Sequence, residues 1–509
     1  MLLVLLLLAG CRATPDPFAI QGADDDDAAN DDDAANDDDS ADDDDAADDD
    51  DLADDDDAAD DDDSASASLC PQVVDGASSG ANPDGSAANP WRFIGDGLFE
   101  AAAIGCARVE LAPGTYNESV LLPSSAPVVL AGADPANPPV IAFVGGPLVT
   151  ALNAPPGAGI ESLLLDCGDQ AASQGLIAVN STLSVQDVVI AGCRSIEGAG
   201  IDARNSTLDA VDLTVQDCIA TSTAGGALRL EGGSLTVSGG QFANNSAIGP
   251  GGGLWLQDVT AWLQAVLFTD NVAGVGSNGG AVFLQGGAVA TGSLTVLDCE
   301  FRDNEAAHGG AVYVEGLAAT AHNSLFQENL ALELGGALYL QSGSGGSVSN
   351  SLFLANEADD GASLYDVGAD TLLEFTTHVD NVASSGSDVR MAAGGETRNG
   401  IFASTSCGSG SGLCGDVINR SSPSTSAVSN VLIWNAEGQA FAGDAANAVA
   451  HIDTDPDFVA YTVGGSPSAW DLHLDAASPA VDAGDPTQGD ADGSPADLGA
   501  YGGPDPYSL

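Results

Sequence analysis

One pattern repeats five times between residues 225 and 356, and it restricts the possible folds of this chain more than any other feature. Each copy opens on a Gly-Gly pair followed by a small and an aliphatic residue, and closes on Phe-x-x-Asn. The copies open at Gly225, Gly251, Gly279, Gly309 and Gly335, and they close at Asn245, Asn271, Asn304, Asn329 and Asn356. Openings that recur every 26 to 30 residues indicate a solenoid in which each copy forms one turn.

Apolar and polar residues alternate inside each copy; Leu228 and Leu230, for example, flank Arg229. A period of two predicts short strands with one buried face. Three such strands, separated by Gly, Ser or Asn, describe one triangular turn, and the stacked asparagines should form a ladder at one corner. We therefore predict an all-β chain that forms a right-handed parallel β-helix. A β-sandwich would also explain the alternation, but not the fixed closing motif.

The paired motif GGA[LIV] and FxxN resembles the repeat of polymorphic outer-membrane proteins, within the wider pectate-lyase-like class of right-handed β-helices. The resemblance covers residues 225–356, and the repeat weakens on both sides. It implies surface display with adhesion or autotransport, and it implies no chemistry by itself.

The predicted β-helix spans residues 70–455. At one turn per roughly 26 residues from residue 105 onward, it should have about 13 turns. Gly95–Ile104 is predicted to be a short helix. The helix and the following Pro113-Gly-Thr-Tyr116 resemble the start of pectate-lyase-like β-helices, which implies that the helix covers the first turn, where strand edges would otherwise be exposed. Residues 456–509 are similar to the C-terminal segment of bacterial β-helix repeat proteins, and we expect them to cover the last turn.

The first eleven residues resemble a bacterial lipoprotein signal. Residues 1–10 are almost entirely apolar and end in Leu8-Ala9-Gly10 before Cys11. The resemblance implies that residues 1–10 are a signal peptide and that Cys11 is acylated, although no Lys or Arg precedes the apolar run. Arg12 at the next position implies an outer-membrane lipoprotein, with the surface as its expected location. A cysteine that follows an apolar start by chance remains the alternative.

Residues 11–69 are predicted to be a disordered acidic tether. Residues 24–63 hold 26 Asp among Ala, Asn, Ser and one Leu, so this stretch cannot bury apolar surface and its charges repel. Diffuse calcium binding is a second interpretation. In the whole chain 10 basic residues face 76 acidic ones, which excludes nucleic acid and anionic membrane surfaces as favoured partners.

Nine cysteines are present, and eight remain if Cys11 is acylated. An even number suits disulfides in an oxidising envelope. Cys70–Cys106 and Cys407–Cys414 are the expected pairs. Cys167, Cys193 and Cys218 recur at the spacing of the later asparagines, so they should occupy the same corner, either as a disulfide between neighbouring turns or as buried thiols.

A search for catalytic residues finds none. Lyases of this fold use an Arg or Lys beside calcium-binding Asp residues, whereas the arginines here are scattered singly, and none should stand beside a recurring Asp pair on adjacent turns. His308 with Asp359 and Asp360 only poorly matches the hydrolases of this fold, and His308 is predicted to be a turn residue. We therefore expect no enzyme, with a polysaccharide lyase or glycoside hydrolase as the alternative.

Calcium is the one metal that the sequence suggests, and no cofactor is required. Asp490-Ala-Asp492-Gly493 is a partial calcium-loop pattern, but it lacks an acid and flanking helices of the EF-hand. The candidate ligands are Asp482, Asp485, Asp490, Asp492 and Asp497. A solvated Asp/Gly turn explains the same residues.

Aromatic residues recur at one outward position, just after the opening motif. They are Trp255, Phe283, Tyr313, Tyr339 and Tyr365. Stacked turns would align them about 4.8 Å apart, either as a ladder that stabilises the sheet or as an exposed platform for sugar rings or a partner surface. The expected function is a lipid-anchored surface β-helix for adhesion, binding or envelope structure, with an envelope or extracellular glycan or protein as partner.

Overall fold

A computed structural model describes most of the chain that follows the acidic tract. The described residues are 70–142, 145–287, 291–368, 371–392, 394–406, 416–420, 428–443, 449–490 and 492–508. The predictions for Cys11, for the tether and for Cys407–Cys414 lie outside the described residues. The described residues from 70 onward belong to one compact unit.

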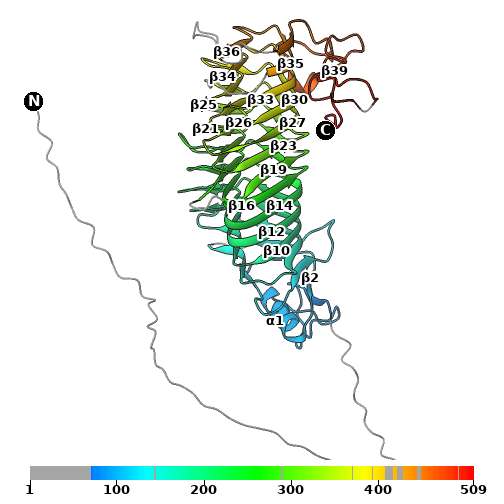
Figure 1. Ribbon diagram of the computed structural model, residues 1–509. Helices are drawn as coiled ribbons and strands as arrows, with labels where there is room; N and C mark the ends of the chain where they lie inside the picture. Colours follow the sequence, from blue (N-terminus) through cyan, green and yellow to red (C-terminus); the bar gives the residue numbers. More distant parts are fainter. Residues whose placement is uncertain are drawn as a thin grey trace, which may run out of the picture. The chain divides into compact units, whose positions relative to one another are not determined.

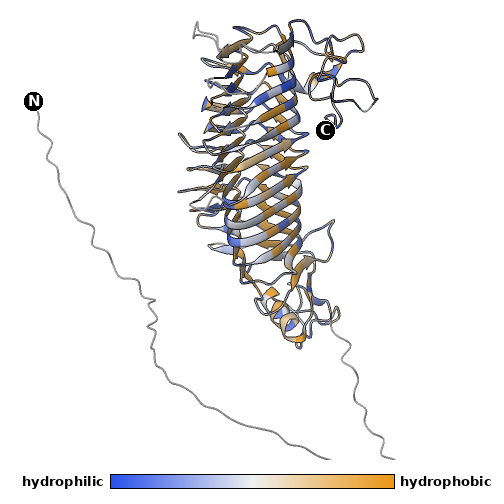
Figure 2. Cartoon of the chain, in the orientation of Figure 1, coloured by the Kyte–Doolittle hydropathy of each residue, from blue (hydrophilic) through white to orange (hydrophobic). Residues whose placement is uncertain are grey.

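This unit is a parallel β-solenoid of about 12 turns with almost no helix, which confirms the predicted fold class (Figure 1). Thirty strands belong to one continuous sheet whose pairs are parallel, and each strand pairs with its equivalent on the next turn. Our expected number of turns was slightly too high, because some turns are longer than the roughly 26 residues that we assumed. Consecutive ladder asparagines are separated by as few as 25 and as many as 33 residues. Figure 2 shows apolar and polar residues alternating along the strands.

One turn illustrates the path of the chain. β22 (Val312–Glu315), β23 (Ala318–His322) and β24 (Leu325–Gln327) form the three sides, and β25 (Leu330–Leu334) leads outward into the next turn. β26 (Leu338–Leu340) then lies on β22 with Tyr339 beside Tyr313. We term a set of residues that occupy the same position in consecutive turns a column.

The other elements have the following bounds. The first turns contain β1 (Gln72–Val74), α1 (Ile94–Ile104), β2 (Arg108–Leu111), β3 (Thr115–Tyr116), β4 (Val120–Leu122), β5 (Val129–Gly132), β6 (Val140–Ala142), β7 (Pro147–Leu152), β8 (Ala158–Asp166), β9 (Gln174–Val179), β10 (Thr182–Ala191) and β11 (Arg194–Ser195). The middle turns contain β12 (Ile201–Gln216), β13 (Ile219–Ala220), β14 (Leu228–Ala243), β15 (Ser246–Ala247), β16 (Leu254–Gln264), β17 (Leu267–Thr269), β18 (Val282–Gln285), β19 (Ser293–Leu297), β20 (Glu300–Arg302) and β21 (Glu305–His308). The last part contains β27 (Gly345–Leu354), β28 (Glu357–Ala358), β29 (Leu364–Asp366), β30 (Leu372–Val379), β31 (Val382–Ala383), β32 (Val389–Met391), β33 (Glu396–Ala403), β34 (Ile418–Arg420), β35 (Val428–Trp434), β36 (Phe441–Gly443), β37 (Val449–Ile452), β38 (Phe458–Ala460), a 3₁₀ helix η2 (Pro467–Ala469) and β39 (Asp471–Leu474).

The predicted asparagine ladder is present and fully buried. It consists of Asn245, Asn271, Asn304, Asn329, Asn356 and Asn381. Asn304 shows the pattern: its amide nitrogen donates to the main-chain oxygen of Phe268 (3.1 Å) and to Oδ1 of Asn329 (2.9 Å). Its own Oδ1 accepts from the main-chain N–H (3.1 Å) and the amide (3.0 Å) of Asn271. The ladder therefore satisfies backbone groups at a corner that no strand pairs.

A second ladder fills the core. Phe242, Phe268, Phe301, Phe326, Phe353, His378 and Phe402 stack with ring centroids 4.4–5.1 Å apart. The first five rings come from the closing motifs of the five repeats, His378 and Phe402 continue the ladder beyond them, and the six phenylalanines are completely buried. Burial and stacking of these rings add to the stability of the turns that carry them.

Helix α1 covers the first turn, as predicted. It buries Ile94, Leu98 and Ala101, and it ends where Gly105 adopts the left-handed conformation (φ 74°) that terminates many helices. Gly97 lets the helix approach the first strands closely, since a Cβ there would lie 2.8 Å from Cγ2 of Val74.

The C-terminal segment reaches further than expected. Instead of covering only the last turn, it lies along the side of the solenoid, where Figure 1 shows it in red. Gln488 bonds to Asn399 (2.8 Å), and the main-chain N–H of Ser508 donates to Asn323 (2.8 Å), several turns back. Its apolar residues Leu472, Ala500 and Tyr507 pack on outward Leu325, Leu352 and Leu354. The segment thus shields an apolar strip that would otherwise face water.

Two disulfides are described. Cys70–Cys106 confirms the predicted pair and ties the start of the described chain to the end of α1. Cys167–Cys193 joins neighbouring turns, while Cys218, on the next turn, is a buried thiol. The main-chain N–H of Cys218 donates to Oδ1 of Asn245 (3.0 Å), so the cysteines do share the asparagine column. Burial raises the pKa of Cys218 to about 12, which makes it unreactive.

These pairings predict a thiol count. With Cys11 replaced by serine, the denatured protein from an oxidising compartment should react with at most four equivalents of a thiol reagent. The described disulfides leave Cys218, Cys299, Cys407 and Cys414 as the candidates. A count of eight would contradict both disulfides, and reduction before denaturation should restore all eight as a control.

Candidate functional site

The predicted aromatic column exists, but most of it is not exposed. Phe283, Tyr313, Tyr339 and Tyr365 stack with centroids 4.9–5.3 Å apart. Trp255, Phe283, Tyr313 and Tyr339 are only 5–8 % exposed, because Ala224, Leu334 and Val367 from the corner loops pack against the rings. The expectation of an exposed platform was therefore wrong. From Phe283 to Tyr365 the facing rings cover one another, so the faces inside this stack are closed to a sugar ring.

Arginines stand in the same column at both ends of the aromatic stack. Arg229 pairs in register with Trp255, and its guanidinium carbon lies 4.9 Å from the Trp255 ring centroid. Arg390 occupies the next position beyond Tyr365. The cation–π contact and the stacked rings together explain this column as a stabilising element of the sheet.

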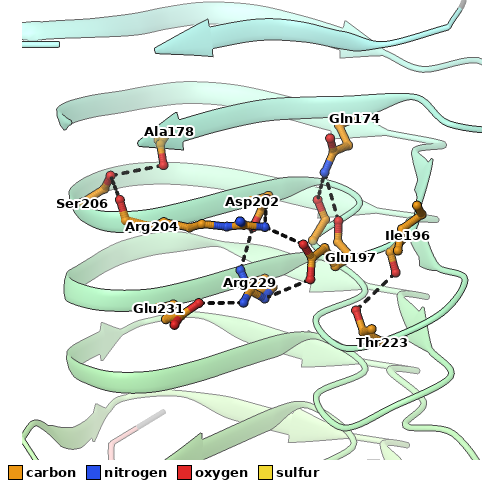
Figure 3. Close-up of polar contacts among 11 residues, drawn as sticks. Gln174, Ala178, Ile196, Glu197, Asp202, Arg204, Ser206, Thr223, Arg229 and Glu231 are labelled. Carbon is orange, nitrogen blue, oxygen red and sulfur yellow. Dashed lines mark hydrogen bonds and ion pairs between the residues drawn. The ribbon is translucent and has the colours of Figure 1, made fainter. Parts of the chain in front are cut away.

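A network of ion pairs surrounds Arg229 (Figure 3). Arg229 contacts Asp202 (3.1 Å), Glu231 (2.8 Å) and Glu197 (3.5 Å). Arg204 contacts Glu197 and Asp202 as well. The strand register produces this network, because Asp202 lies beside Arg229 and Arg204 lies beside Glu231 on the next turn. The sequence showed single, scattered arginines, whereas in the structure Arg204 and Arg229 share acids across adjacent turns, because the columns set the nearest neighbours between turns.

Burial and ion pairing shift the pKa values of the charged groups in this network in opposite directions. Burial raises the pKa of Asp202, against the opposing effect of Arg204 and Arg229. Burial works to lower the pKa of Arg229, but the carboxylates of Glu197 and Asp202 outweigh it and raise that pKa. Each guanidinium already contacts two or three carboxylates. Because these contacts link residues on adjacent turns, the main effect of the network is to hold neighbouring turns together. Of the two arginines in this network, Arg204 is more accessible to a ligand than Arg229, because its side chain is 44 % exposed.

A polar cluster interrupts the core three turns before the end. His378 takes the place of phenylalanine in the core ladder, between Phe353 and Phe402. Its Nδ1 lies 2.9 Å from Oγ of Ser363, and its Nε2 lies 3.0 Å from Oγ1 of Thr376. Ser363 in turn hydrogen-bonds to Oδ1 of Asp388.

The cluster is completely buried, so its residues titrate abnormally. Burial lowers the pKa of His378 to about 3 and raises the pKa of Asp388 to about 7. Oδ2 of Asp388 has no hydrogen-bond partner and lies 3.9 Å from Nδ1 of His378. Because these groups have no exposed surface, we interpret the cluster as a feature of core stability and not as a catalytic site.

His308 lies at the end of β21, where it contacts Asn278 (3.0 Å) and the edge of the Tyr339 ring (5.4 Å). His308 is therefore the last residue of a strand, directly before the corner at Gly309, and not the turn residue that we predicted. Asp360, two turns further on, accepts a hydrogen bond from the main-chain N–H of Ser387. Neither residue forms a catalytic arrangement with the other in the described contacts.

The candidate calcium ligands are only partly brought together. Asp497 accepts from the N–H of Asp482 (2.7 Å), and Asp490 accepts from the N–H of Asp497. Asp485 and Asp492 instead close separate turns onto Thr487 and Ser494. In the part of the chain that the structure describes, no three acidic, His or Cys side chains form a group that could hold a metal ion. Calcium binding stays a prediction.

Trp262 is not among the site residues that the sequence predicted. This residue lies in β16 between Ala261 and Leu263, both buried, and its side chain points outward and is 44 % exposed. The same alternation that identified the aromatic column would have found Trp262, but it stands alone in its column and so forms no repeated motif.

Comparison with known proteins adds no relative: no family model matches the chain, and no curated protein matches it significantly. Within the described residues, every helix is too short or too polar to cross a bilayer.

Proposed function

We propose that this protein is a lipid-anchored, surface-displayed β-solenoid of a bacterial outer membrane that serves binding, adhesion or envelope structure. The single observation that carries the proposal is the order of parts along the chain. A lipobox-like Leu-Ala-Gly-Cys11 is followed by the acidic stretch 24–63, and then by a solenoid of about 12 turns. Such an order suits the display of a folded rod at a distance from a membrane.

The wider classification is part of this proposal. The GGA[LIV] and FxxN motifs support placement among the polymorphic outer-membrane protein repeats of the pectate-lyase-like class. Their structural counterparts support it too, since the glycines sit at corners and the Phe and Asn residues form the two internal ladders.

Replacing Cys11 by serine tests the anchor. The variant should lose all labelling by a radioactive fatty acid and should move from the membrane fraction to the soluble fraction, because a single cysteine would carry the acyl chains. Substitution of buried Cys299 by serine serves as the control and should change neither result. Unchanged labelling and fractionation of the Cys11 variant would refute the anchor, and resistance of the protein on intact cells to added protease would refute surface display.

A polysaccharide lyase is the second candidate, favoured by the ion-pair network of Arg204, Arg229 and their acids. In that case Arg204 would act as the base toward an acidic polysaccharide. The test is formation of unsaturated products from polygalacturonate, which Arg204→Gln should abolish. Activity that survives this substitution, or absence of any product, removes the network as a catalytic site.

A further inference from the structure

One flat outer face of the solenoid carries hydroxyl and amide side chains around a single exposed indole. Trp262 lies in a column with Asp209, Thr236, Thr295 and Thr320. Two flanking columns contain Ser234, Thr260 and Ser293 on one side, and Ser238, Gln264 and Leu297 on the other. We term these residues the Trp262 face.

Trp262 differs from the other tryptophans that the structure describes. Trp255 is buried beneath Arg229, and Trp434 and Trp470 are partly buried against Tyr461. No aromatic ring within the described residues stacks on Trp262, although it stands on the same solenoid as two stacked ladders. An indole that is 44 % exposed on a regular sheet adds nothing to the core, whose nearest members are Ala261 and Leu263.

The surrounding groups indicate the chemistry of a ligand. A sugar ring presents an apolar face of C–H groups and a rim of hydroxyls, and it is bound by an aromatic face together with a few well-placed polar groups. The hydroxyls of Thr236 and Thr295 flank the indole on the adjacent turns, and Gln264 follows it along the strand. Such groups donate to and accept from hydroxyls without carrying charge.

The charge of the face decides between classes of polysaccharide. Asp209 lies in the Trp262 column, and Asp298 lies 3.5 Å from the amide of Gln264. The named residues of the Trp262 face include no arginine, and the chain contains no lysine; the column of Gln264 continues through Leu297 to His322 and reaches Arg398 three turns beyond His322. An acidic polysaccharide would meet only like charge here, whereas a neutral one would not.

We propose that the Trp262 face binds a neutral polysaccharide, with one sugar ring stacked on the indole and the chain running across the hydroxyl columns. This inference deepens the binding role proposed above and rests on it. Sheet strands about 4.8 Å apart give the ligand equivalent hydroxyl positions on successive turns. The face therefore suits a repeating polymer better than a single small molecule.

Calorimetric titration of the full chain carrying Cys11→Ser tests the proposal. The probes are cellohexaose, chitohexaose and, as an acidic comparison, a hexamer of galacturonate. We expect at least one neutral hexamer to bind and the acidic hexamer to bind more weakly. Trp262→Ser should raise the Kd about tenfold or more, because an aromatic anchor carries much of the affinity of a site. Trp262→Phe should retain part of the binding.

Val275→Ser is the matched control, since Val275 is 99 % exposed and lies outside the Trp262 face. It should leave the Kd unchanged, and all three variants should melt within a few degrees of the parent. Failure of the parent chain to bind either neutral hexamer at millimolar concentration overturns the proposal, as does equal affinity after Trp262→Ser. Stronger binding of the acidic hexamer overturns the assignment to neutral polymers. None of these outcomes affects the labelling and fractionation test of the anchor, so the two proposals fail separately.

Discussion

Replacing Asn304 by alanine should lower the free energy of unfolding by about 4 kcal/mol, since a buried polar group left without a partner costs about 1–3 kcal/mol. The Asn304 side chain makes four hydrogen bonds at the centre of the asparagine ladder. Its loss would leave the main-chain oxygen of Phe268 and the main-chain N–H of Asn271 without these partners in a fully buried corner. The measurement is denaturant unfolding followed by intrinsic fluorescence, with hydrogen exchange to locate the loss.

Hydrogen exchange should accelerate first in the turns next to Asn304, because each turn of a solenoid contacts mainly its neighbours. Asn137→Ala, at an exposed loop position, is the matched control and should change stability by less than about 0.5 kcal/mol. If the two variants were equally stable, the ladder would be a consequence of stacking and not a cause of its stability.

Single substitutions at His378 and Asp388 should give stabilities with opposite pH dependence. Asp388→Asn should make the protein more stable as pH rises from about 4 to 6.5, and His378→Phe should make it less stable over the same range. Each slope can reach about 1.4 kcal/mol per pH unit. Over two pH units the two variants would thus diverge by on the order of 5 kcal/mol.

The signs follow from the two shifted pKa values. Asp388 keeps its proton in the folded protein up to about pH 7, but its unfolded pKa is near 3.8. Its contribution is therefore fully present below pH 3.8 and is lost as pH rises to 7. His378 stays neutral in the folded protein down to about pH 3, but its unfolded pKa is near 6.5. Its contribution is present above pH 6.5 and is lost as pH falls. In the parent protein the two slopes nearly cancel between pH 4 and 6.5.

Hydrogen exchange of strands β29 to β33, measured at pH 4.5 and pH 6.5 and corrected for intrinsic rates, resolves this local effect. The groups that face His378 and Asp388 are Ser363, Thr376, Asn381 and Thr405, none of which titrates in this range. His322→Gln, at a partly exposed histidine, is the control and should keep the parental pH dependence. If the stabilities of the His378 and Asp388 variants changed with pH in the same direction, His378 would not be neutral and Asp388 would not be protonated in the folded protein over this pH range.

Particular columns show why the fold was predictable from the sequence. The repeat places Asn304 and Asn329 25 residues apart with Phe301 and Phe326 in step, so both ladders follow once turns stack in register. The same arithmetic placed Cys218 in the asparagine column. A period of two and a fixed corner motif are local properties of the chain, and stacking identical turns leaves one register that buries every inward residue.

The candidate sites were less predictable, because exposure depends on segments that are remote in sequence. Tyr313 points outward as expected, but Leu334 and Val367 come from later turns to cover its column. Asp202 and Arg229 are 27 residues apart and meet only through the register of the sheet. Trp262 is exposed because no loop in the described structure covers its face, and a single residue produces no repeat by which to recognise it.

The sequence by itself thus determined the solenoid and the asparagine ladder, since both follow from local spacing, and it indicated the capping helix and the Cys70–Cys106 pair. The tertiary structure alone decided which outward side chains meet solvent. It also decided that arginines and acids of adjacent turns join, that His378 and Asp388 converge in the core, and that residues 456–508 lie along the side. The physical reason is that burial and charge pairing depend on distances between turns, whereas strand periodicity depends on neighbours along the chain.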